Sequence, residues 1–105
     1  MPVVYHTVAR VGDLQPGELC YVEAGGKAIC LANVDGEIVA LDNACTHERA
    51  PLSDGAITGD RIECPLHGGA FNVRSGEPLS YPAVFPVKTY RVEIDGDQIR
   101  VGIRS

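Results

Sequence analysis

The sequence predicts an all-β domain, a sandwich or barrel built from short antiparallel strands. Apolar residues gather in short β-like runs, and no helix-length amphipathic segment stands out among them. The runs are separated by hairpin-type turns, and the 105 residues include twelve glycines and seven prolines. A chain of this length has room for one hydrophobic core, so we expect a single domain over residues 1–105.

Six apolar runs are the expected strands: 3–8, 19–23, 28–34, 38–41, 87–94 and 99–103. Gly25-Gly26 separates the second run from the third, and Asp35-Gly36 separates the third from the fourth. Asp95-Gly96 lies between the last two runs. Such dipeptides are typical of tight hairpin turns, and they predict antiparallel pairing of the flanking strands.

The middle of the chain differs from the rest. Between Asn43 and Pro78 the sequence is rich in glycine, proline and polar residues, and its apolar runs are brief, at 61–63 and 70–73. A loop-dominated stretch of this length needs something besides a core to order it, and a metal centre that ties two loops together would do so. We therefore expect a small subdomain at about 42–76, inserted into the β scaffold.

Two Cys-His pairs lie in this segment. Cys45 and His47 form the first pair, and Cys64 and His67 follow after sixteen intervening residues. Structural zinc usually takes a Cys-x-x-Cys pair followed by a pair of histidines, whereas each pair here mixes the two residue types. A two-iron cluster suits the mixture, because two thiolates can hold one iron and two imidazoles the other.

The loops Cys45-Thr46-His47 and Cys64-Pro65-Leu66-His67-Gly68 resemble the two binding loops of the Rieske [2Fe-2S] family. The resemblance covers the chain, because ferredoxins of this family have similar lengths. It implies the Rieske fold, an antiparallel β-sandwich or barrel base with an inserted cluster-binding subdomain. It also implies that Cys45 and Cys64 ligate one iron, and that His47 and His67 ligate the other through Nδ1.

Surrounding residues predict the redox behaviour. Respiratory-complex members of the family have an extra cysteine in each loop, joined as a disulfide, where this chain has Ala50 and Leu66. They also have Ser and Tyr hydroxyls bonded to the cluster, where this chain has Gly69 and Phe71. Fewer hydrogen bonds to sulfur predict a potential toward the low end of the roughly −150 to +300 mV Rieske range. We also expect reduction to make protonation of the ligand histidines easier.

The remaining residues point to an electron carrier that is not itself an enzyme. Only His6 is left to build the mononuclear iron site of the terminal oxygenases, which takes two histidines and a carboxylate. No Gly-x-Gly-x-x-Gly stretch is present to bind a dinucleotide. The resemblance implies a ferredoxin that passes electrons from an NAD(P)H-dependent flavoprotein ferredoxin reductase to the terminal oxygenase of an aromatic-ring dioxygenase system.

Two alternatives stay open: a Rieske-like small subunit of an assimilatory nitrite reductase, and a zinc-stabilised interaction module.

As a shuttle, the chain is expected to be a monomer that meets both partners at the face around His47 and His67. Pro82 and Pro86 flank a stretch that resembles the loop covering one side of the cluster in the family. The expected docking rim comprises Glu48, Arg49, Pro51, Leu52, Gly68 and Gly69.

Charge and hydropathy limit which partners and which cellular compartment we expect for this protein. The formal net charge of −5 comes from scattered acids, which argues against a nucleic-acid partner. No apolar run approaches the ~18 residues of a membrane span. The first residues do not read as a secretion signal, so we expect a cytoplasmic protein. In that reducing compartment Cys20 and Cys30 are expected to be free core thiols, although hairpin geometry would allow them to approach each other.

Overall fold

The computed structural model describes residues 2–45, 50–65, 68–81 and 83–104. These residues form three antiparallel sheets, and the prediction of an all-β chain is confirmed. Two short 3-10 helices accompany the strands of these sheets. Sheet A has the order β1 (Val3–Arg10), β11 (Gln98–Arg104), β10 (Val92–Asp95); sheet B has the order β2 (Leu19–Ala24), β3 (Lys27–Val34), β4 (Glu37–Asp42), β9 (Thr89–Tyr90); sheet C has the order β5 (Ala56–Thr58), β6 (Arg61–Glu63), β7 (Ala70–Asn72), β8 (Pro78–Ser80); the helices are η1 (Val11–Asp13) and η2 (Leu52–Asp54).

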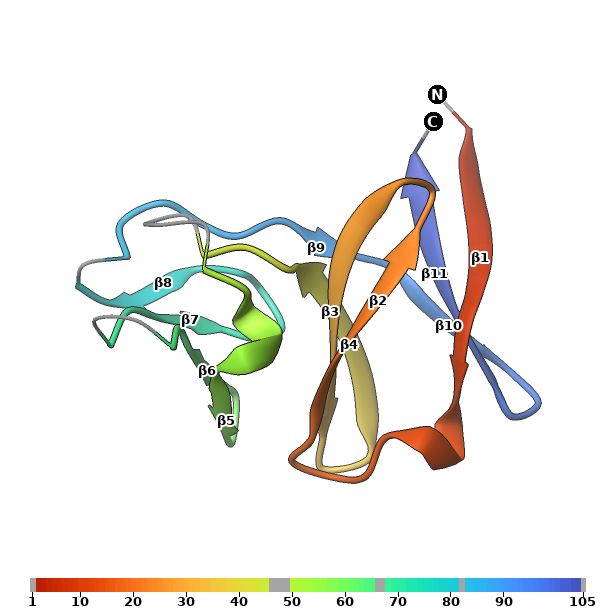
Figure 1. The fold of residues 1–105 in the computed structure, drawn as a ribbon, viewed down its shortest axis with the longest axis horizontal. Coiled ribbons are helices and arrows are strands. Elements are labelled where there is room, and N and C mark those ends of the chain that lie inside the picture. Colours follow the sequence, from red (N-terminus) through yellow and green to blue (C-terminus); the bar gives the residue numbers. More distant parts are fainter. Residues whose placement is uncertain (1, 46–49, 66–67, 82, 105) are drawn as a thin grey trace.

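Sheets A and B form the base of the molecule, and sheet C stands beside them together with η2 (Figure 1). Sheet C occupies residues 56–80 and is made of strands only three residues long. It lies in the segment that the sequence marks as rich in loops. In the described ranges, no helix has the length and apolar character that crossing a membrane requires.

Two of the hairpin turns are those that the dipeptides predict, whereas the third falls on Gly96-Asp97, because Asp95 still pairs with Gln98. Gly25 and Gly26 join β2 to β3, and both have positive φ, +55° and +79°. Asp35 and Gly36 join β3 to β4 with φ of +52° and +98°. Two consecutive positive φ angles are the mark of the I′ turn, which matches the twist of the strands on either side.

The expected strand at 87–94 is wrong as a single element. It breaks at Arg91 into β9, which pairs with β4, and β10, which pairs with β11. The Arg91 carbonyl already accepts a hydrogen bond from the Gly102 amide of β11, at 2.9 Å. The segment therefore changes its pairing partner at this point and crosses from sheet B to sheet A.

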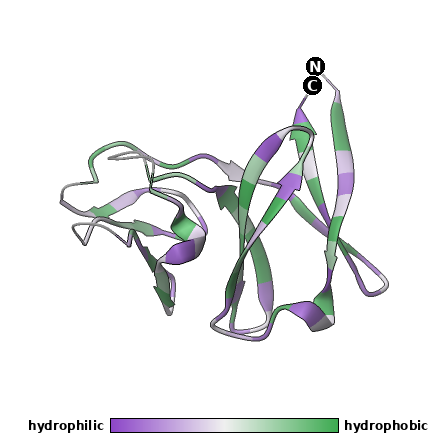
Figure 2. Ribbon diagram, viewed as in Figure 1, coloured by the Kyte–Doolittle hydropathy of each residue, from purple (hydrophilic) through white to green (hydrophobic). Residues whose placement is uncertain are grey.

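Sheet B carries a core on each of its faces. Ile29 and Leu31 pack with residues of β11 such as Val101 between sheets A and B. On the opposite face, Cys30 packs with Phe71 of sheet C and with further buried residues of the segment 43–87, which we call the cluster-side segment. Because β3 is buried on both faces, it reads as a continuous apolar run, and Figure 2 shows hydrophobic segments along the strands of the base.

The register of the β2–β3 hairpin separates the two remaining thiols. Cys20 is paired with Leu31, and Tyr21 is paired with Cys30, so the two cysteines are on opposite faces of sheet B. Cys20 packs on the core shared with sheet A, whereas Cys30 lies in the other core. Both are free thiols, as expected, and the hairpin does not bring their sulfurs together.

Candidate metal centre

Two of the four candidate ligands, Cys45 and Cys64, are in the described part of the chain. Cys45 follows the end of β4, and Cys64 directly follows β6. Their side chains are 0% and 4% exposed, and both belong to the core between sheets B and C. The other two candidates, His47 and His67, lie outside the described residues, so their ligation stays a prediction.

The two loops are closed at their bases by the same kind of hydrogen bond. The Cys45 amide donates to the Ala50 carbonyl at 2.8 Å, and the Cys64 amide donates to the Gly69 carbonyl at 2.7 Å. In both cases the amide of residue i meets the carbonyl of residue i+5. Each Cys-His pair of the sequence therefore belongs to a six-residue loop of matching closure, with its cysteine at the start.

Side chains outside the loops anchor them. Asn43 lies just before the first loop, and its Oδ1 accepts the Ser53 amide of η2 at 2.7 Å. Behind the second loop, the Ser80 hydroxyl of β8 donates to the Gly68 carbonyl at 3.0 Å. The Arg61 guanidinium donates in turn to the Ser80 hydroxyl at 3.3 Å. Both loops are thus tied to the secondary structure of the cluster-side segment.

The segment after β8 folds back onto the same core. The Ala83 amide donates to the Ser80 carbonyl at 3.1 Å, and the Val87 amide donates to the Gly76 carbonyl at 2.9 Å. Ala83 and Val87 are buried in the core that contains the two thiols. The stretch that the sequence marks by its prolines therefore covers one side of this core.

Residues near the loops match the expected lack of hydroxyl donors. Phe71 is fully buried in the core with the thiols, and it has no hydroxyl to offer. Gly69 has no side chain, and its carbonyl is occupied by the Cys64 amide. Ala50 is buried at the place where a loop-bridging cysteine is found in the respiratory type.

Part of the expected docking rim is wrong. Leu52 is 0% exposed, because η2 turns its side chain into the core, and Gly69 is buried where it closes the second loop. Pro51 and Gly68 are exposed, as expected. The remaining two rim residues, 48 and 49, lie outside the described ranges.

The sequence analysis missed an exposed apolar group beside the second loop. Tyr81 is 84% exposed and Phe85 67% exposed, while Val84 is 56% and Leu79 49% exposed. We call these four residues the apolar rim. Its sequence signal is a hydrophobic run, bounded by prolines, that follows the second ligand pair without an alternating strand pattern.

The donor chemistry fits half of a mixed cluster. Two buried thiols, neither in a disulfide, suit one iron of a two-iron centre. In the described part of the chain, no three Cys, His, Asp or Glu side chains gather as a metal site. Cys20 and Cys30 therefore do not complete a four-thiolate cluster with Cys45 and Cys64.

A family model described as the Rieske [2Fe-2S] domain matches residues 4–91. The chain belongs to the Rieske [2Fe-2S] family. Its cofactor is accordingly a Rieske-type [2Fe-2S] cluster rather than zinc, and the Rieske fold expected from the two loops is confirmed.

Relatives of this Rieske protein are ferredoxin components. It is 44% identical, over 87% of its length and 88% of the relative, to the ferredoxin component of the naphthalene 1,2-dioxygenase/salicylate 5-hydroxylase systems of a Ralstonia species. It is 39% identical, over 98% and 99% of the two chains, to the naphthalene 1,2-dioxygenase ferredoxin component of Pseudomonas putida. Proteins so named carry electrons within multicomponent oxygenases and are not the catalytic components.

Solved structures agree in fold. A chain from the complex of reduced oxygenase and oxidized ferredoxin in carbazole 1,9a-dioxygenase matches this Rieske protein with a TM-score of 0.89 at 37% identity, covering 93% and 92% of the two chains. A putative nitrite reductase small subunit matches with a TM-score of 0.78 at 23% identity, covering 93% and 97%. At that identity the second likeness shows the fold alone, and it gives the nitrite reductase alternative no further support.

Proposed function

We propose that this protein is the ferredoxin of an aromatic-ring dioxygenase system. It would accept one electron at a time from an NAD(P)H-dependent flavoprotein reductase and deliver it to the terminal oxygenase. The observation that carries the proposal is the near full-length match to ferredoxin components of such systems. A cytoplasmic, monomeric carrier is the form that suits this role, because the cluster must meet two partners in turn.

The proposed ligands are Cys45 and Cys64 on one iron and His47 and His67 on the other. The burial of both thiols and the matching closure of the two loops support this assignment. When bound, the cluster supplies one reversible electron, while the protein sets how strongly that electron is held. The subdomain that carries the ligands is proposed to span about 42–76.

The protein's own contribution on the thiolate side is a set of apolar side chains. Phe71, Leu52 and Val73 are fully buried in the core that contains Cys45 and Cys64. The loop carbonyls accept the two cysteine amides, so these amides do not donate to sulfur. An apolar surrounding disfavours the extra negative charge of the reduced cluster, which supports a low potential.

We propose that partners dock on the apolar rim, Leu79, Tyr81, Val84 and Phe85. The rim lies beside the second loop, because Ser80 of β8 bonds the Gly68 carbonyl directly. Exposed apolar groups of this kind mark interaction sites, and aromatic residues are enriched at interface centres. Electron-transfer contacts are small and short-lived, so four exposed apolar side chains beside the cluster are enough for a specific but weak encounter.

The experiment is a reconstituted electron-transfer assay. Holoprotein is mixed anaerobically with NADH, a flavoprotein ferredoxin reductase and a terminal oxygenase of an aromatic-ring dioxygenase system, and reduction of the oxygenase is followed by absorbance. We expect oxygenase reduction only when this protein is present. The double variant Tyr81→Ser/Phe85→Ser should slow the transfer while the visible spectrum of its own cluster stays unchanged.

The matched control replaces two comparably exposed apolar residues on the base. Tyr21 is 50% exposed on β2 and Ile94 is 51% exposed on β10. Tyr21→Ser/Ile94→Ser should transfer electrons as fast as the wild type. A wild type that passes no electrons to the oxygenase would disprove the function. Equal slowing in both double variants would disprove the docking face alone.

A further inference from the structure

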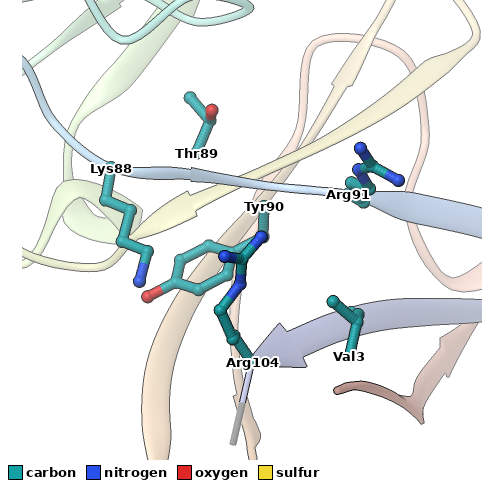
Figure 3. Close-up of a pocket in the computed structure, with 7 residues that line it drawn as sticks. Val3, Lys88, Thr89, Tyr90, Arg91 and Arg104 are labelled. Atoms are coloured by element: carbon teal, nitrogen blue, oxygen red, sulfur yellow. The ribbon is translucent and has the colours of Figure 1, made fainter. Parts of the chain in front are cut away.

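A basic cleft opens between β9 and the terminal ends of β1 and β11. Its volume is about 520 Å³, and the residues that line it include Lys88, Tyr90, Arg91, Arg104 and Val3. Figure 3 shows the Lys88 and Arg104 side chains close to the Tyr90 ring, with Arg91 set apart from them farther along the chain. Lys88, Arg91 and Arg104 are exposed, and they reach the cleft from β9 and its flanks and from the end of β11. Three cations therefore gather at one place on a protein whose formal net charge is −5.

Among the described residues, these three cations differ from the arginines outside the cleft in having no carboxylate partner. Those others each lie within 4 Å of a carboxylate, as Arg10 does with Asp97, Arg61 with Glu63, Arg74 with Glu37 and Asp60, and Arg100 with Asp95. In the described ranges, none of the three cleft cations lies within 4 Å of a carboxylate. Lys27, outside the cleft, is the one further described cation without a carboxylate at that distance. The cleft thus concentrates positive charge that the protein's own acids leave unneutralised.

Asp42 is a carboxylate beside the cleft, and it bonds a tyrosine rather than one of the cations. Its carboxylate accepts the Tyr90 hydroxyl in a short hydrogen bond. Burial and this bond to Asp42 raise the pKa of Tyr90, so the hydroxyl stays protonated and continues to donate. The Lys88 ammonium lies over the ring of Tyr90, with Nζ 5.1 Å from the ring centroid. Tyr90 therefore contacts one cleft cation through its ring and the Asp42 carboxylate through its hydroxyl.

The cleft is coupled to the first ligand loop through the backbone. The Asp42 amide donates to the Lys88 carbonyl at 2.9 Å, and Asp42 is the last residue of β4, three positions before Cys45. A partner that contacts the cleft would therefore be held against the strand that leads into the cluster-binding segment.

We propose that the basic cleft is a docking contact for a carboxylate-rich surface segment of an electron-transfer partner. The proposal rests on the proposed function. Single exposed cations bind hydrated small anions weakly, so the site favours a ligand that offers several carboxylates at fixed spacing. Arg91 and Arg104 present planar forks that match carboxylates in a two-bond geometry. The volume accommodates several side chains.

The net negative charge of the whole protein makes the basic cleft important for orienting an acidic partner. An acidic partner is repelled by most of a surface with net charge −5, and it is attracted only where the cations are unpaired. Such local complementarity orients the encounter and raises its rate more than its final affinity. The cleft would thus select the approach that brings the cluster-side segment toward the partner.

The test measures binding of hexaglutamate to the oxidised holoprotein by calorimetry at low ionic strength. The wild type should bind the peptide, and binding should weaken as salt is added. The double variant Arg91→Gln/Arg104→Gln should bind about tenfold more weakly. The control Arg10→Gln/Arg100→Gln removes the same two charges elsewhere, and its affinity should stay close to that of the wild type.

Several results would overturn the proposal. Equal weakening in both double variants would mean that only net charge matters, and absence of hexaglutamate binding to the wild type would remove the site. Inorganic pyrophosphate binding tightly where hexaglutamate does not would indicate a small-anion site. In the oxygenase-reduction assay, the Arg91/Arg104 variant should lose part of the salt dependence of the rate. No electron transfer by the wild type, with peptide binding intact, would count against the proposed function and not against the cleft.

Discussion

Gly76 offers the sharpest test of how the cluster-side segment is held together. It has φ of +81°, and a Cβ added there would lie 2.1 Å from the Val87 carbonyl oxygen. The Gly76 carbonyl accepts a hydrogen bond from the Val87 amide. Gly26, in the β2–β3 turn, has almost the same φ, +79°, but nothing within 4 Å of its added Cβ. The pair separates backbone strain from steric contact.

The two substitutions should therefore differ in cost. Alanine at either position meets the positive φ, which costs roughly 1–2 kcal/mol. At Gly76 the methyl group must also displace the Val87 backbone, and overpacking of this kind costs typically ~1–3 kcal/mol. Moving Val87 strains or breaks its hydrogen bond to Gly76, worth about 1 kcal/mol. We expect Gly76→Ala to lower the free energy of unfolding by about 3–6 kcal/mol.

Thermal unfolding of the two holoproteins measures this difference. One kcal/mol corresponds to roughly 4–8 °C in a domain of this size. Gly76→Ala should therefore unfold more than about 12 °C below the wild type, and Gly26→Ala, at roughly 4–16 °C, should shift about a third as far as Gly76→Ala. Circular dichroism reports the β fold, and visible absorbance reports retention of the cluster. Equal shifts for the two variants would show that the contact between Gly76 and Val87 does not constrain the fold.

Three further outcomes follow from buried residues of the site. Cys45→Ser and Cys64→Ser should each abolish the visible absorbance and iron content of purified protein, because a hydroxyl is a poor substitute for a thiolate on iron, whereas Cys20→Ser should keep both. Phe71→Ala should lower the free energy of unfolding by about 3–5 kcal/mol in urea melts, because its side chain is fully buried, and a loss under ~1 kcal/mol would contradict the packing. Burial raises the pKa of Cys30 from 9.0 to about 12. Between those values the unfolded thiol ionises while the folded one stays protonated, so stability should fall as pH rises, and less steeply in Cys30→Ala; equal slopes for the two proteins would contradict this.

Local signals explain what the sequence predicts correctly. The turns at Gly25-Gly26 and Asp35-Gly36 need positive φ at two successive positions, and few residue types provide it, so these hairpins are visible in the sequence. The ligand pairs are visible for a similar reason, because the mixed order of Cys and His suits few metal centres other than a two-iron cluster.

Long-range packing explains what the sequence analysis missed. The break at Arg91 arises because the two halves of one apolar run pair with strands of different sheets. The sequence of the run does not show which strands it pairs with. In the sequence Leu52 resembles an exposed loop residue, but in the structure η2 directs its side chain into the core. The basic cleft is built by Lys88 and Arg91 together with Arg104, which joins them only through strand pairing.

The ligation of the cluster is tested most directly by low-temperature electron paramagnetic resonance of the dithionite-reduced holoprotein, with the hyperfine couplings of nitrogen resolved. Two imidazoles on the reduced iron should give a lower average g value than four thiolates, together with couplings from two ring nitrogens. His47→Ala and His67→Ala should each remove one of the two couplings or prevent the cluster from assembling. A four-thiolate spectrum without nitrogen couplings, or a colourless protein that contains zinc, would contradict the assignment.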